Sequence, residues 1–354
     1  MSELDGTQET VLEQPTNDNE ETWKKYWSSQ GQSWRTEPEI SKERQEFLAE
    51  RRKIEPNYEQ RIYPFKDIKL NRADIEWLLS THDNNRGPVD WNDESQRERE
   101  GLDLKGADLR GFNLSGLPLA SCHLIEVHLE DTDLSDAHLT NADLSDAHLE
   151  NASLFNAHLE KASLVQAHLE GALLDIAHLE NAYLDKAHLE KASLVQAHLE
   201  KASLRTAHLE GALLDSVHLE GANLEKAKLV GAYLKEAHLE GANLEKAKLA
   251  RAYLKAAFFD SATKLDEISL NNNEYDTAFL CDIHWGDVNV AVVDWSTISI
   301  LGEENEARED KSRVRYERAV RAYRQLSVVL RNQGLSEHAA RFAFRAQRMQ
   351  RKVF

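Results

Sequence analysis

Residues 137–170 read AHLTNADLSDAHLENASLFNAHLEKASLVQAHLE, and this stretch decides the fold. Leucine occupies every fifth position, and alanine stands two residues before each leucine. On an α-helix, which turns by about 100° per residue, a five-residue step would spread these leucines around the whole cylinder. On a strand, residues two apart point to the same side, so each five-residue unit contributes one inward Ala–Leu pair.

The odd length of the unit requires a corner. A flat strand with a period of five would turn alternate Ala–Leu pairs outward, so the chain must bend once in every unit. Repeated bends close the chain into a coil around an apolar interior. Glycine and asparagine tolerate the positive φ angles of tight corners. They stand at several unit junctions: Gly171, Gly211, Gly221, Gly231, Gly241, Asn141, Asn151 and Asn181.

The A-x-L-x-x unit recurs from Leu104 to Phe259, with Phe112, Leu117 and Cys122 in place of the small residue in early units. This pattern resembles the pentapeptide-repeat family over residues 102–262. The resemblance implies a mainly β solenoid, a right-handed quadrilateral parallel β-helix of about eight coils with about 20 residues each. Its interior is expected to hold ladders that include Leu139, Leu149, Leu159, Leu169, Leu179, Leu189, Leu199, Ala142, Ala152 and Ala162.

The segments before the repeats are expected to cap the column, because an open end exposes a sheet edge and apolar core. Residues 1–20 are predicted to form a disordered acidic tail and residues 21–100 a helical capping region. Helices are expected over residues 21–30, 41–54 and 71–81. Ser41 is the predicted N-cap of the second helix, and Trp77 and Trp91 are expected to plug the first coil.

The segments after the repeats are predicted to form a second cap. We expect the β-helix to span residues 101–262, residues 263–302 to close the last coil, and 283–295 to be a strand. Residues 303–354 are predicted to form a basic helical hairpin, with one helix to Arg331 and a second capped by Ser336. Its arginines include Arg313, Arg321, Arg324, Arg341, Arg345 and Arg348.

The hairpin carries a second resemblance. The sequence YRQL from Tyr323, NQG from Asn332 and ARFAFRAQ from Ala340 is similar to a helical hairpin that links pentapeptide repeats to membrane segments in bacterial proteins. Some of those proteins end in a potassium-channel-like pore. This sequence stops at Phe354, before any membrane span. It is therefore expected to be either a soluble relative or a fragment.

The amino-acid composition disfavours some kinds of partner and location. The net charge of -19 disfavours direct binding to nucleic-acid phosphates. Two cysteines, Cys122 and Cys281, provide neither a disulfide framework nor a thiolate metal site, so a cytoplasmic location is expected. No signal peptide and no apolar run of about 20 residues is apparent.

Histidine precedes the core leucine in many units. The ten-residue spacing of these histidines, set against about 20 residues per coil, places them in two columns on opposite faces, each with glutamate two residues later. Zinc and similar ions favour such donors. The candidate metal ladder comprises His138, His158, His178, His198, His218, Glu160, Glu180 and Glu200. The favoured interpretation is a solvated ladder copied by duplication, because KASLVQAHLE occurs at both 161–170 and 191–200. On that interpretation the chain holds no metal.

A third face carries outward apolar side chains on a rigid wall, which favours a protein interface or a homodimer. The interface residues are Phe155, Leu173, Val195, Leu213, Tyr233 and Tyr253. Catalytic motifs are absent, so we expect neither an enzyme nor a cofactor.

The sequence therefore favours a non-enzymatic scaffold that binds a protein partner. One alternative is a DNA mimic that binds DNA gyrase or topoisomerase, as some family members do, through Asp131, Asp133, Asp136, Asp143 and Asp146. Lys226, Lys228, Lys235, Lys246, Lys248 and Lys255 break up that negative stripe. Another alternative is the soluble cytoplasmic part of a channel-linked protein, in which the basic hairpin contacts an anionic membrane surface.

Overall fold

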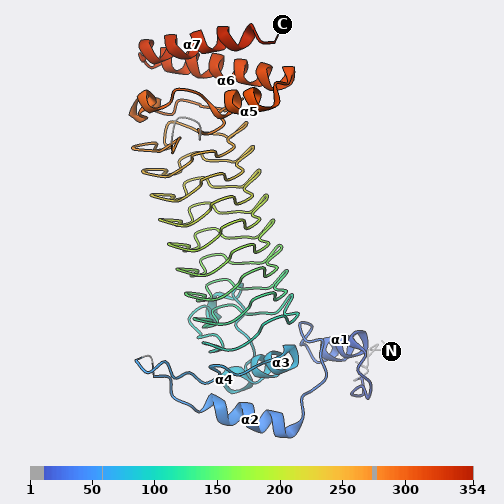
Figure 1. Ribbon diagram of the computed structural model, residues 1–354. Helices are drawn as coiled ribbons and strands as arrows, with labels where there is room; N and C mark the ends of the chain where they lie inside the picture. Colours follow the sequence, from blue (N-terminus) through green and yellow to red (C-terminus); the bar gives the residue numbers. More distant parts are fainter. Residues whose placement is uncertain (1–11, 58, 273–276, 354) are drawn as a thin grey trace, which may run out of the picture.

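The structure is a computed structural model that describes residues 12–57, 59–272 and 277–353. A column of stacked coils stands between a group of N-terminal helices and a C-terminal group formed by α5, α6 and α7 (Figure 1).

Parallel bridges set the register of the column. They join Asp103 to His123, His138 to His158 and His218 to His238, so the chain returns to the same side after each coil. Four such ladders run along the column, one for each five-residue unit of a coil. The predicted β-helix is therefore confirmed, although each unit contributes a single bridge rather than a longer strand in the described ranges. Its right-handed sense stays a prediction.

The corners explain how an odd repeat keeps its apolar pairs inside. In a typical corner the amide of Ala142 donates to the carbonyl of Leu139 over 2.9 Å, and Asn141 between them has a φ of 60°. The equivalent residue has positive φ in every unit from Gly106 to Ala256. Many of these residues are neither glycine nor asparagine, and Ile176 is β-branched. Stacking therefore imposes the left-handed conformation on side chains that disfavour it.

The coils are held together by backbone hydrogen bonds around an apolar interior. The amide of Leu139 donates to the carbonyl of His158 over 2.7 Å, and the amide of His158 donates to Ala137 over 2.9 Å. The predicted core leucines and alanines are buried in one continuous cluster.

The coil path continues past residue 262, where we expected the repeats to end. Bridges join Asn243 to Lys264 and Phe258 to His284, so later coils simply contain longer loops. The predicted strand at 283–295 is wrong: this segment bends at two short 3-10 helices, η2 (Val290–Val292) and η3 (Trp295–Thr297). Its alternation reflects inward pairs of a further coil. Buried residues in this part include Leu265, Ile268, Leu270, Ala278, Leu280, Ile283, Trp285, Val288, Val290, Val293, Trp295, Ile298 and Ile300.

The N-terminal cap contains the predicted helices. They are α1 (Glu20–Ser29), α2 (Lys42–Arg52), α3 (Arg72–Ser80), the short α4 (His82–Asn85) and the 3-10 helix η1 (Glu94–Gln96). Ser41 caps α2, as its sequence predicts. The predicted tryptophan plug needs correction: Ile75, Leu78 and Leu79 of α3 are the fully buried residues here, while Trp77 and Trp91 are only partly buried.

The C-terminal cap contains three helices where we expected two. They are α5 (Gly302–Asp310), α6 (Arg313–Asn332) and α7 (Ser336–Gln350). The helix predicted from residue 303 is interrupted because Lys311 has a left-handed φ of 52°, and Ser312 then caps α6. Ser336 is the first residue of α7 and not its cap. In the described part of the chain, no helix is both long and apolar enough to cross a membrane.

Candidate functional site

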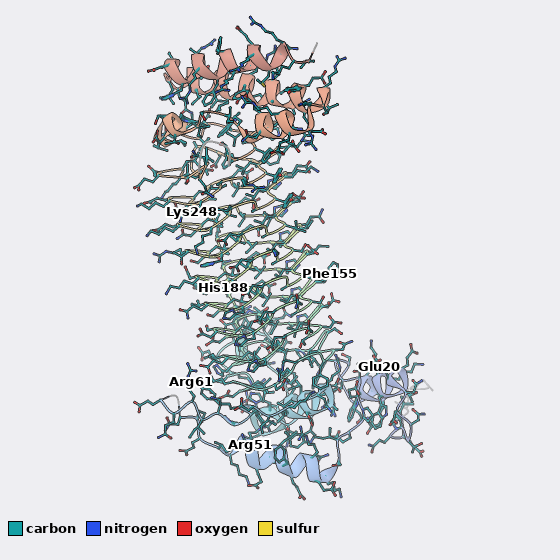
Figure 2. All side chains as sticks on the ribbon, in the orientation of Figure 1. Glu20, Arg51, Arg61, Phe155, His188 and Lys248 are labelled. Carbon is teal, nitrogen blue, oxygen red and sulfur yellow. The ribbon has the colours of Figure 1, made fainter. Side chains whose placement is uncertain are left out.

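Two histidine ladders run along different faces of the column. The first histidine ladder comprises His128, His148, His168, His188 and His208, and the second comprises His138, His158, His178, His198, His218 and His238. Their imidazole rings stack: the centroids of His138 and His158 are 4.9 Å apart with nearly parallel planes. Figure 2 shows His188 and Phe155 at different positions around the column. The bridge register therefore brings together histidines that are 20 residues apart in sequence.

Each ladder is accompanied by glutamates from the same coils. The Nδ1 atom of His158 lies 3.2 Å from Oε1 of Glu160, and this contact recurs with small variations along both ladders. The second oxygen, Oε2, is buried without a hydrogen-bond partner in the described structure at nine of these glutamates: Glu130, Glu150, Glu170, Glu180, Glu190, Glu200, Glu210, Glu220 and Glu240. At Glu160 this oxygen accepts a hydrogen bond from Thr140 Oγ1 over 2.9 Å. The ladders thus stack carboxylates whose second oxygen, Oε2, mostly has no hydrogen-bond partner in the described structure.

His138 begins the second ladder in a different environment. Its own coil has Thr140 where later coils have glutamate, so it lacks the neighbour that His158 has. Burial lowers the pKa of His138 below its ordinary value, and repulsion from His158 lowers that pKa further. His138 is therefore harder to protonate than a free histidine.

The first histidine ladder ends at a lysine. His208 turns away from Glu210 of its own coil and places Nδ1 3.3 Å from Oε1 of Glu190 in the preceding coil. Lys228, which takes the next ladder position, places Nζ 3.1 Å from Nε2 of His208. The His188 and His208 rings are consequently tilted by 40°, with centroids 4.5 Å apart.

Several His–Glu groups have ligand atoms close enough to hold a metal ion. They include His188–Glu190–His208, His198–Glu200–His218 and Glu160–His178–Glu180. Of the predicted ladder residues, His158, His178, His198 and His218 stack with one another, and Glu160, Glu180 and Glu200 lie beside them.

The predicted interface residues lie on one side of the column, which we call the apolar face. Phe155, Leu173, Leu213 and Tyr233 are 45%, 47%, 39% and 42% exposed, and Val195 and Tyr253 are partly buried. Toward the C-terminal cap the face becomes aromatic: the rings of Tyr233 and Tyr253 stack at 4.9 Å, and Tyr253 and Phe279 at 4.1 Å.

The arginines of the basic hairpin divide into two groups. Arg345 lies 3.2 Å from buried Glu304, Arg321 lies 3.6 Å from Asp282, and Arg341 donates to the carbonyl of Trp295. These contacts fasten the hairpin to the last coils. The remaining three stay on the outer surface, where Arg313 pairs with Glu317, Arg324 contacts Gln350, and Arg348 is exposed.

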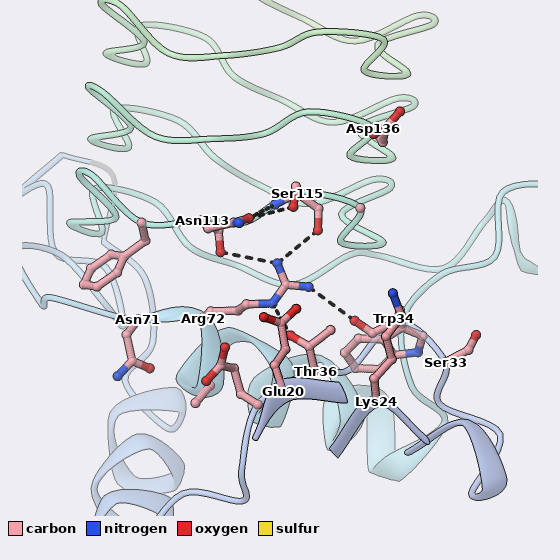
Figure 3. Close-up of a pocket in the computed structure, with 14 residues that line it drawn as sticks. Glu20, Lys24, Ser33, Trp34, Thr36, Asn71, Arg72, Asn113, Ser115 and Asp136 are labelled. Carbon is pink, nitrogen blue, oxygen red and sulfur yellow. Dashed lines mark hydrogen bonds between the residues drawn. The ribbon is translucent and has the colours of Figure 1, made fainter. Parts of the chain in front are cut away.

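A cavity of about 620 Å³ lies between α1, α3 and the first coils (Figure 3). Its prominent cation, Arg72, donates to the carbonyl of Ser115 over 3.0 Å, to Thr36 Oγ1 over 2.8 Å and to buried Glu76 over 2.9 Å. These bonds tie the cap to the column, so this arginine serves the fold rather than a ligand. This network could not be predicted from sequence, because Thr36, Arg72 and Ser115 lie far apart in the chain.

The acidic residues proposed to mimic DNA do not form a stripe. Asp133 and Asp143 lie in different bridge ladders. Asp131, Asp136 and Asp146 are exposed, and each lies at a different one of the four corners of a coil. The negative charge therefore surrounds the early coils instead of following one face.

Comparison with known proteins agrees with this architecture. The family model for pentapeptide repeats matches in 8 copies, over residues 119–154, 152–190, 174–211, 192–231 and 227–263. No curated protein matches the chain significantly.

Two solved structures are similar to part of this chain. HetL, a pentapeptide repeat protein involved in heterocyst differentiation regulation from the cyanobacterium Nostoc sp. strain PCC 7120, is 26% identical with a TM-score of 0.42, over 62% of this chain and 99% of HetL. Full-length QnrB1, a plasmid-mediated fluoroquinolone resistance protein, is 15% identical with a TM-score of 0.35, over 55% of this chain and 92% of QnrB1. The repeat period, the bridge register and the family match lead to one conclusion: residues 119–263 of this chain form a pentapeptide-repeat domain.

Proposed function

We propose that the protein is a non-enzymatic scaffold whose apolar face binds a protein partner. The observation that carries this proposal is the cluster of large apolar side chains exposed on one wall of the column. Single exposed apolar residues are common on soluble proteins, whereas a group of them on one wall is typical of an interface. Ser153, Asp175, Ser193 and Asp215 interrupt this group. Leu173, Leu213 and Tyr233 share one bridge ladder, and Phe155 and Val195 stand at its edge.

The backbone beneath the apolar face supports this role. Each ladder residue is fixed by hydrogen bonds to the coils above and below, such as Leu173 N to Ala152 O over 2.9 Å. A surface that is already ordered loses little conformational entropy when a partner binds, which favours affinity. Aromatic side chains such as Tyr233 and Tyr253 are also enriched in the cores of protein interfaces.

The experiment compares two faces of one protein. The triple variant Leu173→Ser, Leu213→Ser and Tyr233→Ser places on the apolar face the residue already found at Ser153 and Ser193. The control is Tyr183→Ser, because Tyr183 is 53% exposed but lies in another ladder. A partner captured from cells of the source organism is purified, and its affinity for each variant is measured directly.

We expect the triple variant to lose at least tenfold in affinity and the control to bind like the parent. Light scattering on the same proteins tests self-association, which would identify a second copy as the partner. Equal affinity for parent and triple variant would contradict the proposal.

The two alternative roles receive less support from the geometry. Acidic side chains that encircle the column do not reproduce a phosphate backbone on one face, so we expect no inhibition in a gyrase supercoiling assay. Arg321, Arg341 and Arg345 already contact Asp282, Trp295 and Glu304, which leaves a smaller positively charged surface that could bind anionic vesicles. We expect vesicle binding to be weak and abolished by moderate salt.

A further inference from the structure

The end of the first histidine ladder differs from the rest of both ladders in a way that suits a metal ion. Elsewhere, apart from His138, each ladder histidine lies nearest the glutamate of its own coil, and successive rings are nearly parallel. At this end one carboxylate oxygen, Glu190 Oε1, lies 3.3 Å from Nδ1 of His188 and 3.3 Å from Nδ1 of His208. Three potential ligand atoms from two coils therefore converge.

The spacing of these atoms matches tetrahedral coordination. Zinc binds histidine nitrogen and carboxylate oxygen at about 2.0–2.1 Å, which places two ligands of a tetrahedron roughly 3.3 Å apart. The distances from Glu190 Oε1 to Nδ1 of His188 and to Nδ1 of His208 both have this value. Imidazole donors favour zinc, cobalt, nickel and copper over magnesium or calcium, which prefer oxygen alone.

The partial burial of His188, Glu190 and His208 and their access to solvent are also suitable for binding an ion. Glu190 Oε2 is buried without a hydrogen-bond partner in the described structure, so half of the carboxylate remains uncommitted. The side chains of His188, Glu190 and His208 are only partly exposed. A cavity of about 450 Å³ is lined by His168, His188, His208 and Lys228 among others, but not by Glu190. Because all three ligand side chains are partly exposed, an ion can reach them from solvent without unfolding a coil.

We propose that His188, Glu190 and His208 form a binding site for a divalent transition-metal ion of the zinc class, and that Lys228 competes with the ion. The ammonium group of Lys228 lies 3.1 Å from Nε2 and 3.4 Å from Nδ1 of His208, where it donates to the same imidazole that would bind metal. Metal binding requires this flexible side chain to move outward. The three protein ligands leave one coordination position open to water or an anion.

The test uses Co²⁺ as a spectroscopic substitute for zinc on the metal-free full chain. Up to one equivalent is titrated in, because the other His–Glu groups converge less closely and should fill later. A tetrahedral site gives strong visible absorption, whereas an octahedral surface complex absorbs weakly. Unfolding curves recorded without metal show whether each variant retains the fold.

His188→Gln and Glu190→Gln are expected to weaken binding of the first equivalent at least tenfold and to remove the strong absorption. Lys228→Met is expected to tighten binding severalfold, since the competing ammonium is gone. Two controls should behave like the parent: Lys248→Met, one coil further along the same ladder, and His338→Gln in α7. A first equivalent that binds Glu190→Gln as tightly as the parent, or binds only octahedrally, would overturn the site. An unchanged affinity in Lys228→Met would overturn the competition.

Discussion

The column and its two caps each have a buried core, but the side chains in these cores differ in chemistry. Inside the repeats the core consists of leucine and alanine with a few valine, cysteine and hydroxyl side chains. The buried charged residues of the described structure all lie in the caps or the first coil: Arg35, Asp74, Glu76, Lys105, Glu303 and Glu304. The repeated part is thus held by many similar apolar contacts, whereas the caps depend on a few specific polar ones.

This difference shows how the two open ends of the column are covered. Each coil buries its apolar surface against the next, and only the terminal coils need a different covering. At the C-terminal end, Glu304 receives a hydrogen bond from Tyr323 over 2.6 Å and lies 3.2 Å from Arg345. This buried ion pair fixes one arrangement of the hairpin against α5, but the remaining charge is destabilising when one partner is lost.

The largest loss of stability is expected from removing Glu304, which holds this group of buried polar side chains together. Glu304→Ala leaves Arg308, Arg345 and Tyr323 without their shared acceptor, and losing one partner of a buried pair costs about 3–5 kcal/mol. Chemical denaturation measures the loss. Glu309→Ala, at an exposed position of the same helix, is the control and should change stability by less than about 0.5 kcal/mol. A loss of under about 1 kcal/mol for Glu304→Ala would show that the cap does not depend on this pair.

Shortening a core side chain of the column should lower the free energy of unfolding somewhat less. Leu169 is fully buried, and a buried Leu→Ala change costs about 2–5 kcal/mol. Leu173 in the next unit points outward, so Leu173→Ala should be nearly neutral. Denaturation of the two variants measures this contrast directly. Similar losses at both positions would contradict the inward and outward assignment.

The third prediction concerns pH and the C-terminal cap. Burial raises the pKa of Glu303 from 4.5 to about 7, although its Oε1 accepts a hydrogen bond from the amide of Cys281 over 2.6 Å. A raised pKa in the folded state favours the protonated form. Its contribution to stability is therefore complete below pH 4.5 and is lost as pH rises through about 7.

The free energy of unfolding of the cap, followed by near-ultraviolet circular dichroism, should therefore fall by about 2–3 kcal/mol between pH 5 and pH 8. Glu303→Gln keeps an acceptor for Cys281 and removes the titration, so its cap should show a flatter pH dependence. An equally steep dependence in this variant would assign the effect to another group.

The smallest change in stability is expected from a substitution at Ile176, a corner residue of the column. Ile176 has a φ of 60°, which a β-branched residue rarely adopts, and its side chain is exposed. Ile176→Gly should relieve this strain and stabilise the column by about 0.5–1 kcal/mol. Val165→Gly, at a corner position without positive φ, should destabilise it instead. Thermal unfolding distinguishes the two, and a lower Tm for Ile176→Gly would contradict the strain argument.

The column could be predicted from sequence because every unit repeats the same local constraint. Five-residue spacing fixes which side chains point inward, and the same arithmetic places His138 below His158. The coils after residue 262 escaped detection because their inward pairs, such as Val288 and Val290, are not alanine and leucine, and because longer loops interrupt the period.

The caps and the metal site could be predicted only in outline. Glu76 meets Thr36, and Glu304 meets Arg345, through contacts between residues remote in sequence. The break between α5 and α6 occurs at Lys311, a residue with no tendency to end a helix. Sequence spacing identified the His–Glu ladders, but the convergence at Glu190 depends on the tilt of His208 beside Lys228.

The central claim is that residues 20 apart lie directly above one another on the same face. Cysteines introduced in pairs and labelled with pyrene test it, because two pyrenes emit as an excimer only when they touch. The native thiols Cys122 and Cys281 are buried and burial raises the pKa of each to about 12, so they should not react. We predict strong excimer emission from His178→Cys with His198→Cys and none from His178→Cys with His188→Cys. Excimer emission from the second pair, or its absence from the first, would contradict the stacked-coil architecture.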